Sequence, residues 1–226
     1  MEYRHELKFE VSDIELKKIE YRIKPFLHKD EHQNGDYYLI RSIYFDDIYD
    51  SCLNENMAGT DKRYKFRIRT YDGSSDIIRL EKKSKEHNMT NKDSAAITTD
   101  ACRTYMSGQI PRLSGCISEL EKELFAVAKT KRMLPKCIVE YERSAYIMRT
   151  GNVRVTFDRN IRGTLNVKDF FEDRIDAVPV LPSGMHVLEV KYDEFLPQYL
   201  LEVLDLGGLH RQSFSKYASV RLACQN

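Results

Sequence analysis

The sequence predicts an α+β fold in which helices cover the outside of an antiparallel β-barrel of about eight strands. Three observations support this fold class. Charged and apolar side chains alternate with a period of two along several segments, which is typical of strands with one ionised face and one apolar face. The segments are closely spaced and joined by turn signals, which favours antiparallel pairing. No linker, composition change or internal repeat divides the chain, so residues 1–226 are expected to form a single domain.

The chain opens with a strand and then a helix. The ionised face of the strand carries Arg4, Glu6 and Lys8, and its other face carries Tyr3, Leu7 and Phe9.

The helix is expected to begin at Ser12, because Ser12 and Glu15 form a capping box. Apolar residues then recur at near-helical spacing over residues 14–27. Pro25 should end or kink the helix just before it. A polar loop is expected over residues 28–36.

The next part of the chain predicts three strands. Aromatic and β-branched residues indicate a strand at Tyr37–Phe45, followed by a turn-rich or short helical connection over residues 47–61. Strands at Arg63–Tyr71 and Asp76–Lys85 are joined by a tight turn at Asp72-Gly73-Ser74, which is a hairpin signal.

Residues 86–94 are polar and are expected to be a mobile connection. Helical spacing follows at Thr99–Met106 and Ile117–Lys129. A long strand at Cys137–Arg149 should pair with Val153–Asp158 through a Gly151-Asn152 turn. The last strand and the last helix are expected at His186–Tyr192 and Ser215–Cys224. Two strands of the barrel are less clearly marked, and their candidates are residues 94–99 and 162–170.

Bulk composition excludes several classes of function. Basic and acidic residues nearly cancel, 36 against 35, so general nucleic-acid binding has no support and a bound anion would need locally organised positive charge. No apolar run is long enough for an integral membrane segment, and the N-terminus does not resemble a signal peptide. The five scattered cysteines and the six histidines fit neither a disulfide framework nor a metal-ligand spacing, which favours a cytoplasmic protein with reduced thiols.

The ionised strand faces are dense in cations. On one strand Lys65, Arg67 and Arg69 follow one another at intervals of about 7 Å. Such a face can simply meet water, as in many antiparallel sheets. If the sheet curls around the cations instead, their mutual repulsion favours a receptor for a polyanion.

The ordered motifs of the chain resemble those of the VTC domain family, the catalytic domain of vacuolar transporter chaperone polyphosphate polymerases and its bacterial relatives. This family belongs to the triphosphate tunnel metalloenzymes, which also include the CYTH-type triphosphatases. The resemblance spans Arg4 to Lys216 and rests on eight motifs in order: R-x-E-x-K from Arg4, S-x-Y-F-D from Ser42, R-x-K-x-R-x-R from Arg63, L-E-x-K from Leu80, Y-x-R from Tyr141, R-x-T-x-D from Arg154, L-E-x-K-Y from Leu188 and S-F-S-K-Y from Ser213.

The resemblance implies a closed tunnel lined by the ionised face. It implies catalytic roles for Lys8, Arg67, Arg69, Lys83, Arg143 and Arg154. It implies further phosphate contacts from Arg4, Lys65, Lys191, Ser215 and Lys216. Because carboxylates among cations are hard oxygen ligands, it also implies a Mn²⁺ or Mg²⁺ ion held by Glu189, Glu6 and Glu81.

One departure separates the chain from the tunnel triphosphatases. Those enzymes begin with E-x-E-x-K, whereas the first glutamate position here is Arg4. One metal-binding carboxylate fewer favours the polymerase branch over the hydrolases.

Three functions remain open on the sequence alone. The first is a polyphosphate polymerase that transfers the γ-phosphoryl group of ATP to a polyphosphate chain, with a phosphate oxygen as the attacking group. The second is metal-dependent hydrolysis of tripolyphosphate or a nucleoside triphosphate. The third is a non-catalytic module that binds polyphosphate or a nucleotide.

Overall fold

The computed structural model describes residues 4–31, 33, 35–87, 89–110 and 113–225. Its centre is an antiparallel sheet whose main path runs through β1 (His5–Ser12), β10 (Met185–Tyr192), β8 (Val153–Thr164), β7 (Leu134–Met148), β3 (Tyr38–Asp46), β4 (Arg63–Tyr71), β5 (Arg79–Glu86) and β6 (Met89–Ala96). Two short strands lie off this path: β2 (His28–Lys29) pairs with β7, and β9 (Val178–Pro179) pairs with β8.

The α-helices within the described residues are α1 (Asp13–Ile23), α2 (Ser51–Met57), α3 (Thr99–Met106), α4 (Glu119–Lys131), α5 (Gln198–Leu204) and α6 (Lys216–Ala223). Short 3₁₀ turns occur at Leu113–Gly115, Thr150–Asn152, Val167–Phe171 and Leu206–Gly208. None of the described helices is long and apolar enough to cross a membrane.

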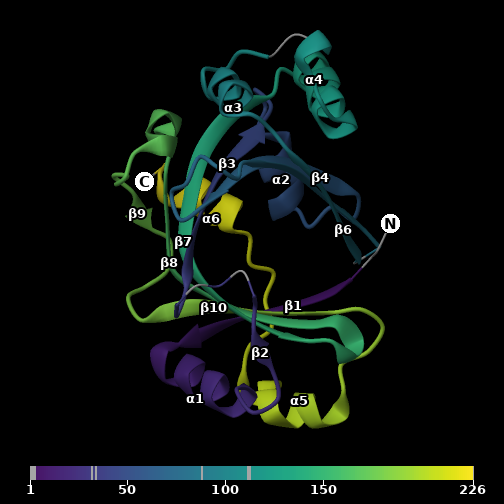
Figure 1. Ribbon diagram of the computed structural model, residues 1–226, viewed down its shortest axis with the longest axis vertical. Coiled ribbons are helices and arrows are strands. Elements are labelled where there is room, and N and C mark those ends of the chain that lie inside the picture. The colour runs from purple at the N-terminus through teal and green to yellow at the C-terminus, as the bar shows by residue number, and fades with distance from the viewer. Residues whose placement is uncertain (1–3, 32, 34, 88, 111–112, 226) are drawn as a thin grey trace.

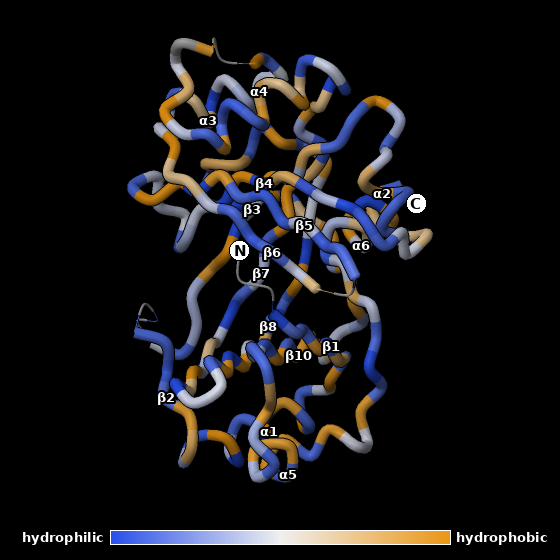
Figure 2. Tube along the Cα trace, turned by 90° about the vertical axis from the view of Figure 1, so that its right-hand side faces the viewer, coloured by the Kyte–Doolittle hydropathy of each residue, from blue (hydrophilic) through white to orange (hydrophobic). Residues whose placement is uncertain are grey.

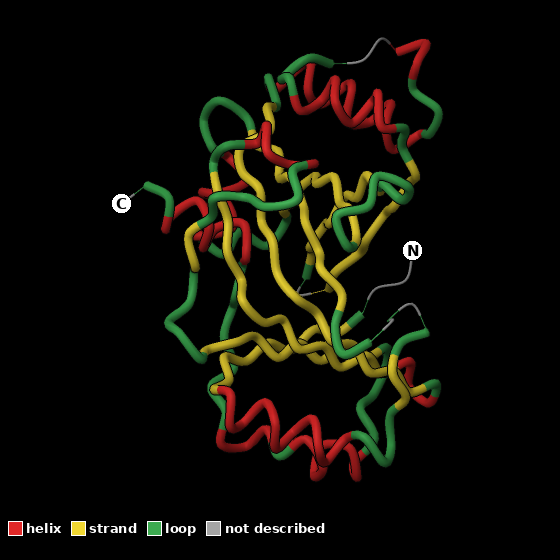
Figure 3. The backbone as a smooth tube through the Cα atoms, turned by 60° about the vertical axis from the view of Figure 1, so that its left-hand side comes forward, coloured by secondary structure: helices red, strands yellow, loops and turns green. Residues whose placement is uncertain are grey.

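The sheet curls strongly, and the strands wrap around a central space in Figure 3. Within the described residues, its two edge strands, β1 and β6, are joined by one isolated bridge, in which the Arg4 amide lies 3.4 Å from the Thr90 carbonyl oxygen. Further along β1, the segment before α6 takes up the free edge, because the Gln212 amide donates to the Lys8 carbonyl at 3.0 Å. The described residues therefore form an open half-barrel, and the closed barrel expected from the sequence is not confirmed.

Four helices cover the apolar face of the sheet in two groups (Figure 1). Helices α1 and α5 lie against β1, β10 and β8, where Leu16, Ile19 and Leu200 join a buried apolar cluster. Helices α3 and α4 lie beyond β3, β4 and β5, on the opposite end of the molecule. In Figure 2 apolar residues gather where these helices meet the strands, as the period-two pattern predicted.

Helix α6 differs from the prediction that helices pack on the outside, because it lies against the ionised side of the sheet. The ring of Tyr217 on α6 stacks on that of Tyr44 on β3, with centroids 5.3 Å apart. Gly163 on β8 permits this approach, since a Cβ atom there would come within 2.4 Å of Val220. A fully buried carboxylate, Asp46, accepts a hydrogen bond from the Tyr217 hydroxyl at 2.6 Å and so fixes the helix.

Most predicted elements are confirmed within a few residues. The capping box at the start of α1 is present, since the Ser12 amide donates to a Glu15 carboxylate oxygen at 2.7 Å. The helix ends at Ile23, ahead of Pro25. Tyr3, predicted on the apolar face of the first strand, lies outside the described residues.

Three expectations were wrong in part. The polar segment 86–94 is not a mobile connection, because Met89–Ala96 forms β6 and pairs with β5 along its whole length. Residues 94–99 give only the end of that strand, since α3 begins at Thr99. Residues 162–170 continue β8 as far as Thr164 and then turn into a 3₁₀ helix. For β6, backbone pairing with β5 decided the structure, because a polar edge strand carries no apolar pattern in the sequence.

Candidate functional site

The concave side of the half-barrel gathers the ionised faces of the strands into one surface. The strand registers and the position of α6 bring ten cations together there: Lys8, Lys65, Arg67, Arg69, Lys83, Lys92, Arg143, Arg154, Lys191 and Lys216. Four carboxylates lie among them: Glu6, Glu81, Asp158 and Glu189. A chain of nearly balanced net charge thus has a strong local excess of positive charge.

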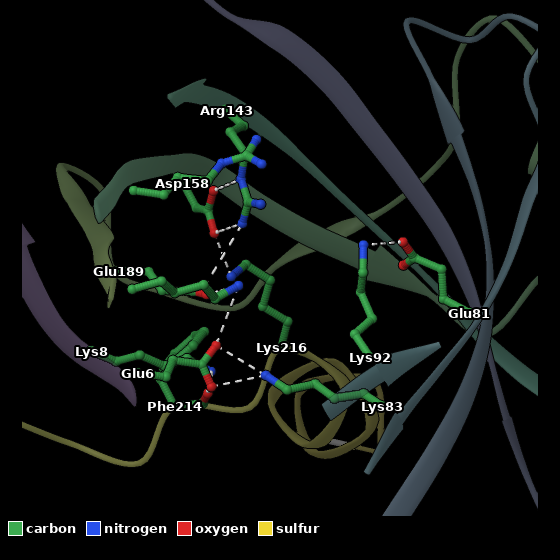
Figure 4. A network of polar contacts seen from close by, with 12 residues as sticks. Glu6, Lys8, Glu81, Lys83, Lys92, Arg143, Asp158, Glu189, Phe214 and Lys216 are labelled. Carbon is green, nitrogen blue, oxygen red and sulfur yellow. Dashed lines mark hydrogen bonds and ion pairs between the residues drawn. The ribbon is translucent and has the colours of Figure 1, made fainter. Parts of the chain in front are cut away.

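Glu6 connects the edge strand β1 with β5, the strand next to the other edge, across the opening of the half-barrel. Its carboxylate lies 2.8 Å from the Lys83 ammonium on β5, 3.6 Å from Lys191 and 3.8 Å from Lys8 (Figure 4). Burial alone would raise the pKa of Glu6, but the surrounding lysine charges lower it. Glu6 therefore stays ionised and holds β5 against β1 where backbone pairing is missing.

A second network surrounds Asp158, which is fully buried. Its two oxygens accept hydrogen bonds from the Arg143 guanidinium at 2.6 and 2.7 Å, and one of them lies 2.6 Å from the Lys216 ammonium. Glu189 lies beside this group, 4.0 Å from Arg143 and 2.5 Å from Lys191. Despite their burial, neighbouring cations hold the pKa values of both carboxyl groups below their usual range.

A third network surrounds Glu81 on β5. Its carboxylate lies 2.7 Å from Arg67, 3.1 Å from Lys92 and 3.7 Å from Arg69. Burial opposes its ionisation, but Arg67 and Arg69 lower its pKa strongly. Tyrosine hydroxyls complete the arginine contacts: Arg67 donates to Tyr44 at 2.9 Å, and Arg69 donates to a second tyrosine, on β7, at 3.1 Å.

Two cavities open onto the concave surface at different places. The first has a volume of about 290 Å³, and the predicted site residues that line it are Glu6, Lys8, Lys65, Lys83 and Ser215. The second has a volume of about 340 Å³ and is lined by Arg4 and Arg154. There Arg154 pairs with Asp30 at 2.8 Å, and Arg4 pairs with Asp193 at the same distance.

The six predicted catalytic cations consequently do not line one cavity. Lys8 and Lys83 face the first cavity and Arg154 faces the second. The three arginines between them, Arg67, Arg69 and Arg143, are held in the ion-pair networks, because buried guanidinium groups need carboxylate partners. Lys191 and Lys216, predicted as phosphate contacts, belong to the same networks.

The three predicted metal ligands are not brought together as one set. Glu6 and Glu189 lie close enough to influence each other's pKa, whereas Glu81 lies apart from them, beside Lys92 in Figure 4. Within the part of the chain that the structure describes, no group of three His, Cys, Asp or Glu residues is arranged to hold a metal ion. The buried hydroxyl of Thr156, opposite Glu189 in the strand register, makes no hydrogen bond with the described residues, and the nearby oxygen of Glu189 is paired with the Lys191 ammonium at 2.5 Å.

The carboxylates at these positions could hold a hard cation only if a bound ligand supplied further oxygen atoms. Mg²⁺ is commonly held by one or two carboxylates together with substrate phosphates. Glu6 and Glu189 lie near each other and supply two such carboxylates, but both are paired with lysines: Lys83 donates to both oxygens of Glu6, and Lys191 lies 2.5 Å from Glu189. A cation held there would have to displace these lysines. Glu81 lies apart from this pair, among Arg67, Arg69 and Lys92.

Sequence reasoning missed several residues of this surface. Asp158 appeared in the R-x-T-x-D motif but was not chosen, although its parity with Arg154 places it on the ionised face. Lys92 was not predicted, because the polar pattern of residues 86–94 indicates a loop, whereas the structure forms β6 there. Tyr44 was read as a motif position only, yet its hydroxyl contacts Arg67. Burial raises the pKa of Tyr44, but the charges of Arg67, Lys65 and Arg69 outweigh this and lower it to about 8.

Anion binding at the first cavity should weaken as the pH rises from 7 to 9. Burial and the charges of Lys8 and Lys191 lower the pKa of Lys83 to about 7, against the attraction of Glu6. A bound anion favours the charged lysine, so binding above pH 7 takes up a proton and becomes weaker as the pH rises. We expect the affinity for tripolyphosphate to fall about tenfold over this range, with proton uptake measurable by calorimetry in buffers of different ionisation enthalpy.

The Lys83→Arg variant is the matched control, because arginine stays charged throughout. It should lose most of this pH dependence and keep the remainder that comes from Lys65, whose pKa burial lowers to about 8. Proton release on binding, or an unchanged dependence in Lys83→Arg, would contradict the assignment.

Comparison with known proteins gives a consistent picture. The model of a family described as the VTC domain matches residues 3–223. No curated protein matches the chain. A Bacillus halodurans structure, described provisionally as an adenylate cyclase, is 12% identical with a TM-score of 0.54, over 95% of this chain and 94% of that one. A Vibrio parahaemolyticus structure with the same provisional description is 11% identical with a TM-score of 0.53, over 97% and 98%. At these identities the likeness shows a shared fold.

Proposed function

The chain belongs to the VTC domain family, and on that premise we propose that it transfers the γ-phosphoryl group of ATP to a growing polyphosphate chain. The observation that carries the proposal is the excess of cations over carboxylates on a concave, partly buried surface. A condensed phosphate chain has one or more charges on every unit, and few other small ligands match so many cations in so small a space.

Different cations suit different tasks in this reaction. Arg67, Arg69 and Arg143 present planar guanidinium groups that can grip two oxygens of one phosphate. Lys8 and Lys83 are compact charges that face the open cavity, where a phosphate would enter. The attacking group is a phosphate oxygen of the acceptor, so no side chain has to act as nucleophile. Catalysis then depends on in-line positioning and on neutralising the charge of the transferred group.

The carboxylates keep these cations in place before the substrate arrives. Asp158 holds Arg143 and Lys216 through contacts of 2.6 to 2.7 Å, so neither side chain has to be ordered by the ligand. This preorganisation reduces the entropy that binding would otherwise lose. Mn²⁺ or Mg²⁺ bound by Glu6 and Glu189 would add further positive charge against the phosphate oxygens.

The reaction can be tested with purified protein, ATP and Mn²⁺, followed by separation of polyphosphate, ADP, orthophosphate and tripolyphosphate. Formation of one ADP for each phosphate unit added to polyphosphate would support the proposal. Orthophosphate or tripolyphosphate as the main product would indicate a hydrolase instead. Saturable tripolyphosphate binding without any turnover would indicate a binding module. Omitting the protein, and replacing Mn²⁺ with a chelator, are the controls.

Replacing Glu189 with glutamine should abolish metal-stimulated turnover and leave tripolyphosphate affinity equal or higher. Glutamine keeps the shape of the side chain but loses the negative charge that a hard cation requires. Removing that charge also leaves the surface more positive, which favours an anion. The measurement pairs calorimetric binding of tripolyphosphate with product formation from ATP, each with and without Mn²⁺.

Glu194→Gln is a control for this variant, because Glu194 is exposed outside the concave surface. If Glu189→Gln keeps full metal stimulation, Glu189 serves only as the partner of Lys191 and Arg143. The metal site would then have to be sought at Glu6 first.

A further inference from the structure

Strands β4 and β5 present a ladder of facing charged side chains that runs from Arg69 opposite Arg79 at one end to Arg63 opposite Lys85 at the other. Within it, Arg67 opposite Glu81 is an ion pair with a separation of 2.7 Å. The next pair outwards is Lys65 opposite Lys83. After it comes Arg63 opposite Lys85. Like charges directly opposite each other on antiparallel strands destabilise the sheet, so two consecutive pairs of this kind need a reason.

The outermost cations of the described residues have no carboxylate in direct contact. Among the described residues, no carboxylate lies within 4.0 Å of a charged nitrogen of Arg63, Lys85 or Arg211. Burial, together with the charges of Arg63, Lys8 and Arg211, lowers the pKa of Lys85 against the attraction of Glu6. Among the described residues, the Thr60 carbonyl accepts a hydrogen bond from the Arg63 side chain.

These three cations share the first cavity with the inner residues. Its lining includes Arg63, Lys85 and Arg211 together with Lys8 and Lys83. Along β4, Arg63 and Lys65 lie two residues apart on the same face, a step of about 7 Å. Cations therefore follow one another from the inner networks along this cavity, with Glu6, the partner of Lys83, as the carboxylate among its lining residues.

We propose that Arg63, Lys85 and Arg211 form an outer binding site for those units of a linear polyphosphate that extend beyond the phosphates held by the inner cations. The inference rests on the proposed function and adds a preference for chains longer than three phosphates. A nucleoside offers no charge to three cations and would leave them uncompensated. A polyphosphate chain has a negative charge on each successive unit, which matches a continuous row of cations.

The test compares tripolyphosphate with a long linear polyphosphate as ligands at constant ionic strength. The variant is Lys85→Gln/Arg211→Gln, and the control is Lys17→Gln/Lys18→Gln, which removes the same charge from the exposed side of α1. Wild-type protein should bind the long chain more tightly than tripolyphosphate. The variant should lose about tenfold in affinity for the long chain, since two partly exposed charge contacts are worth roughly one order of magnitude. Its affinity for tripolyphosphate should change less than about twofold, and the control should match wild type with both ligands.

The outcomes separate this inference from the proposed function. If wild-type protein binds tripolyphosphate but binds the long chain no more tightly, the outer site is overturned while the inner surface stands. Equal losses for both ligands in the variant would also overturn it. Absence of any binding by the wild type would overturn the proposed function and the inference together.

Two further measurements distinguish loss of the outer site from a folding defect and from general polyanion binding. The charge-preserving variant Lys85→Arg/Arg211→Lys should bind the long chain as wild type does, which a general folding defect would not allow. A single-stranded DNA oligonucleotide serves as a polyanion of different chemistry. If the glutamine variant loses as much affinity for DNA as for polyphosphate, the three cations are a general polyanion surface and the proposal is wrong.

Discussion

Replacing Arg67 with alanine should reduce turnover about 10²- to 10³-fold, the usual effect of removing one preorganised donor from a charged transition state. Arg67 is half-buried beside Arg69 and directs its guanidinium toward the concave surface. The variant also removes the closest partner of the buried Glu81 carboxylate, at 2.7 Å. We therefore expect a loss of about 1–3 kcal/mol in the free energy of unfolding.

Whether Arg67→Ala is more or less stable than the wild type shows which effect dominates, repulsion among the cations or their pairing with carboxylates. Crowded like charges alone would predict that removing an arginine stabilises the empty protein. The ion pair with Glu81 reverses this expectation, because an uncompensated buried carboxylate is costly. Lys92 at 3.1 Å and Arg69 at 3.7 Å remain to hold Glu81, which keeps the loss moderate.

Steady-state kinetics and thermal unfolding of the same preparations check both parts of the prediction. Arg67→Lys should fall between wild type and alanine, since lysine keeps the charge but not the planar pair of donors. Arg174→Ala, at an exposed position, is the surface control. Wild-type turnover in Arg67→Ala would assign Arg67 a purely structural role.

Replacing Asp158 with asparagine should give the largest loss of stability of any single substitution on the concave surface. Asp158 is fully buried and compensates two cations, Arg143 and Lys216, at 2.6 to 2.7 Å. Removing one partner of a buried ion pair typically costs about 3–5 kcal/mol. For a chain of this size, that corresponds to a decrease in Tm of roughly 10 °C.

A second substitution shows whether unpaired charge is the cause. Asp158→Asn/Lys216→Met removes one of the two stranded cations and should recover part of the lost stability. Tripolyphosphate should raise the Tm of Asp158→Asn more than that of wild type, because the anion replaces the missing carboxylate.

The control is Asp205→Asn, which breaks an exposed pair with Arg22 at 2.9 Å and should cost less than about 1 kcal/mol. An Asp158→Asn variant as stable as this control would show that Arg143 and Lys216 find other partners. The concave networks would then be more adaptable than their geometry indicates.

Local rules were sufficient for most of the elements. The capping box at Ser12 and Pro25 set the limits of α1, because both act within a few residues of the backbone that they affect. Period-two alternation placed Lys8, Arg67 and Glu189 on one face of the sheet, since side-chain direction along a strand depends only on parity. The same parity places Asp158 on the ionised face, but only the structure shows that it is buried.

Contacts between segments that are distant in the sequence decided which charged side chains pair, and the alternation of side chains could not predict this. Parity assigns Glu6 to the ionised face, but only the curl of the sheet brings its carboxylate to Lys83, 77 residues further along the chain. The sequence likewise could not show that Gln212 would occupy the edge of β1 and leave the barrel open. Nor could it show that α6 would carry Lys216 to Asp158 from the concave side. The sequence by itself therefore determined which side chains are charged and which face they share, because these are properties of one strand. The tertiary structure alone decided which cations are paired and which remain available to an anion, because that depends on distances between strands that are not neighbours in the chain.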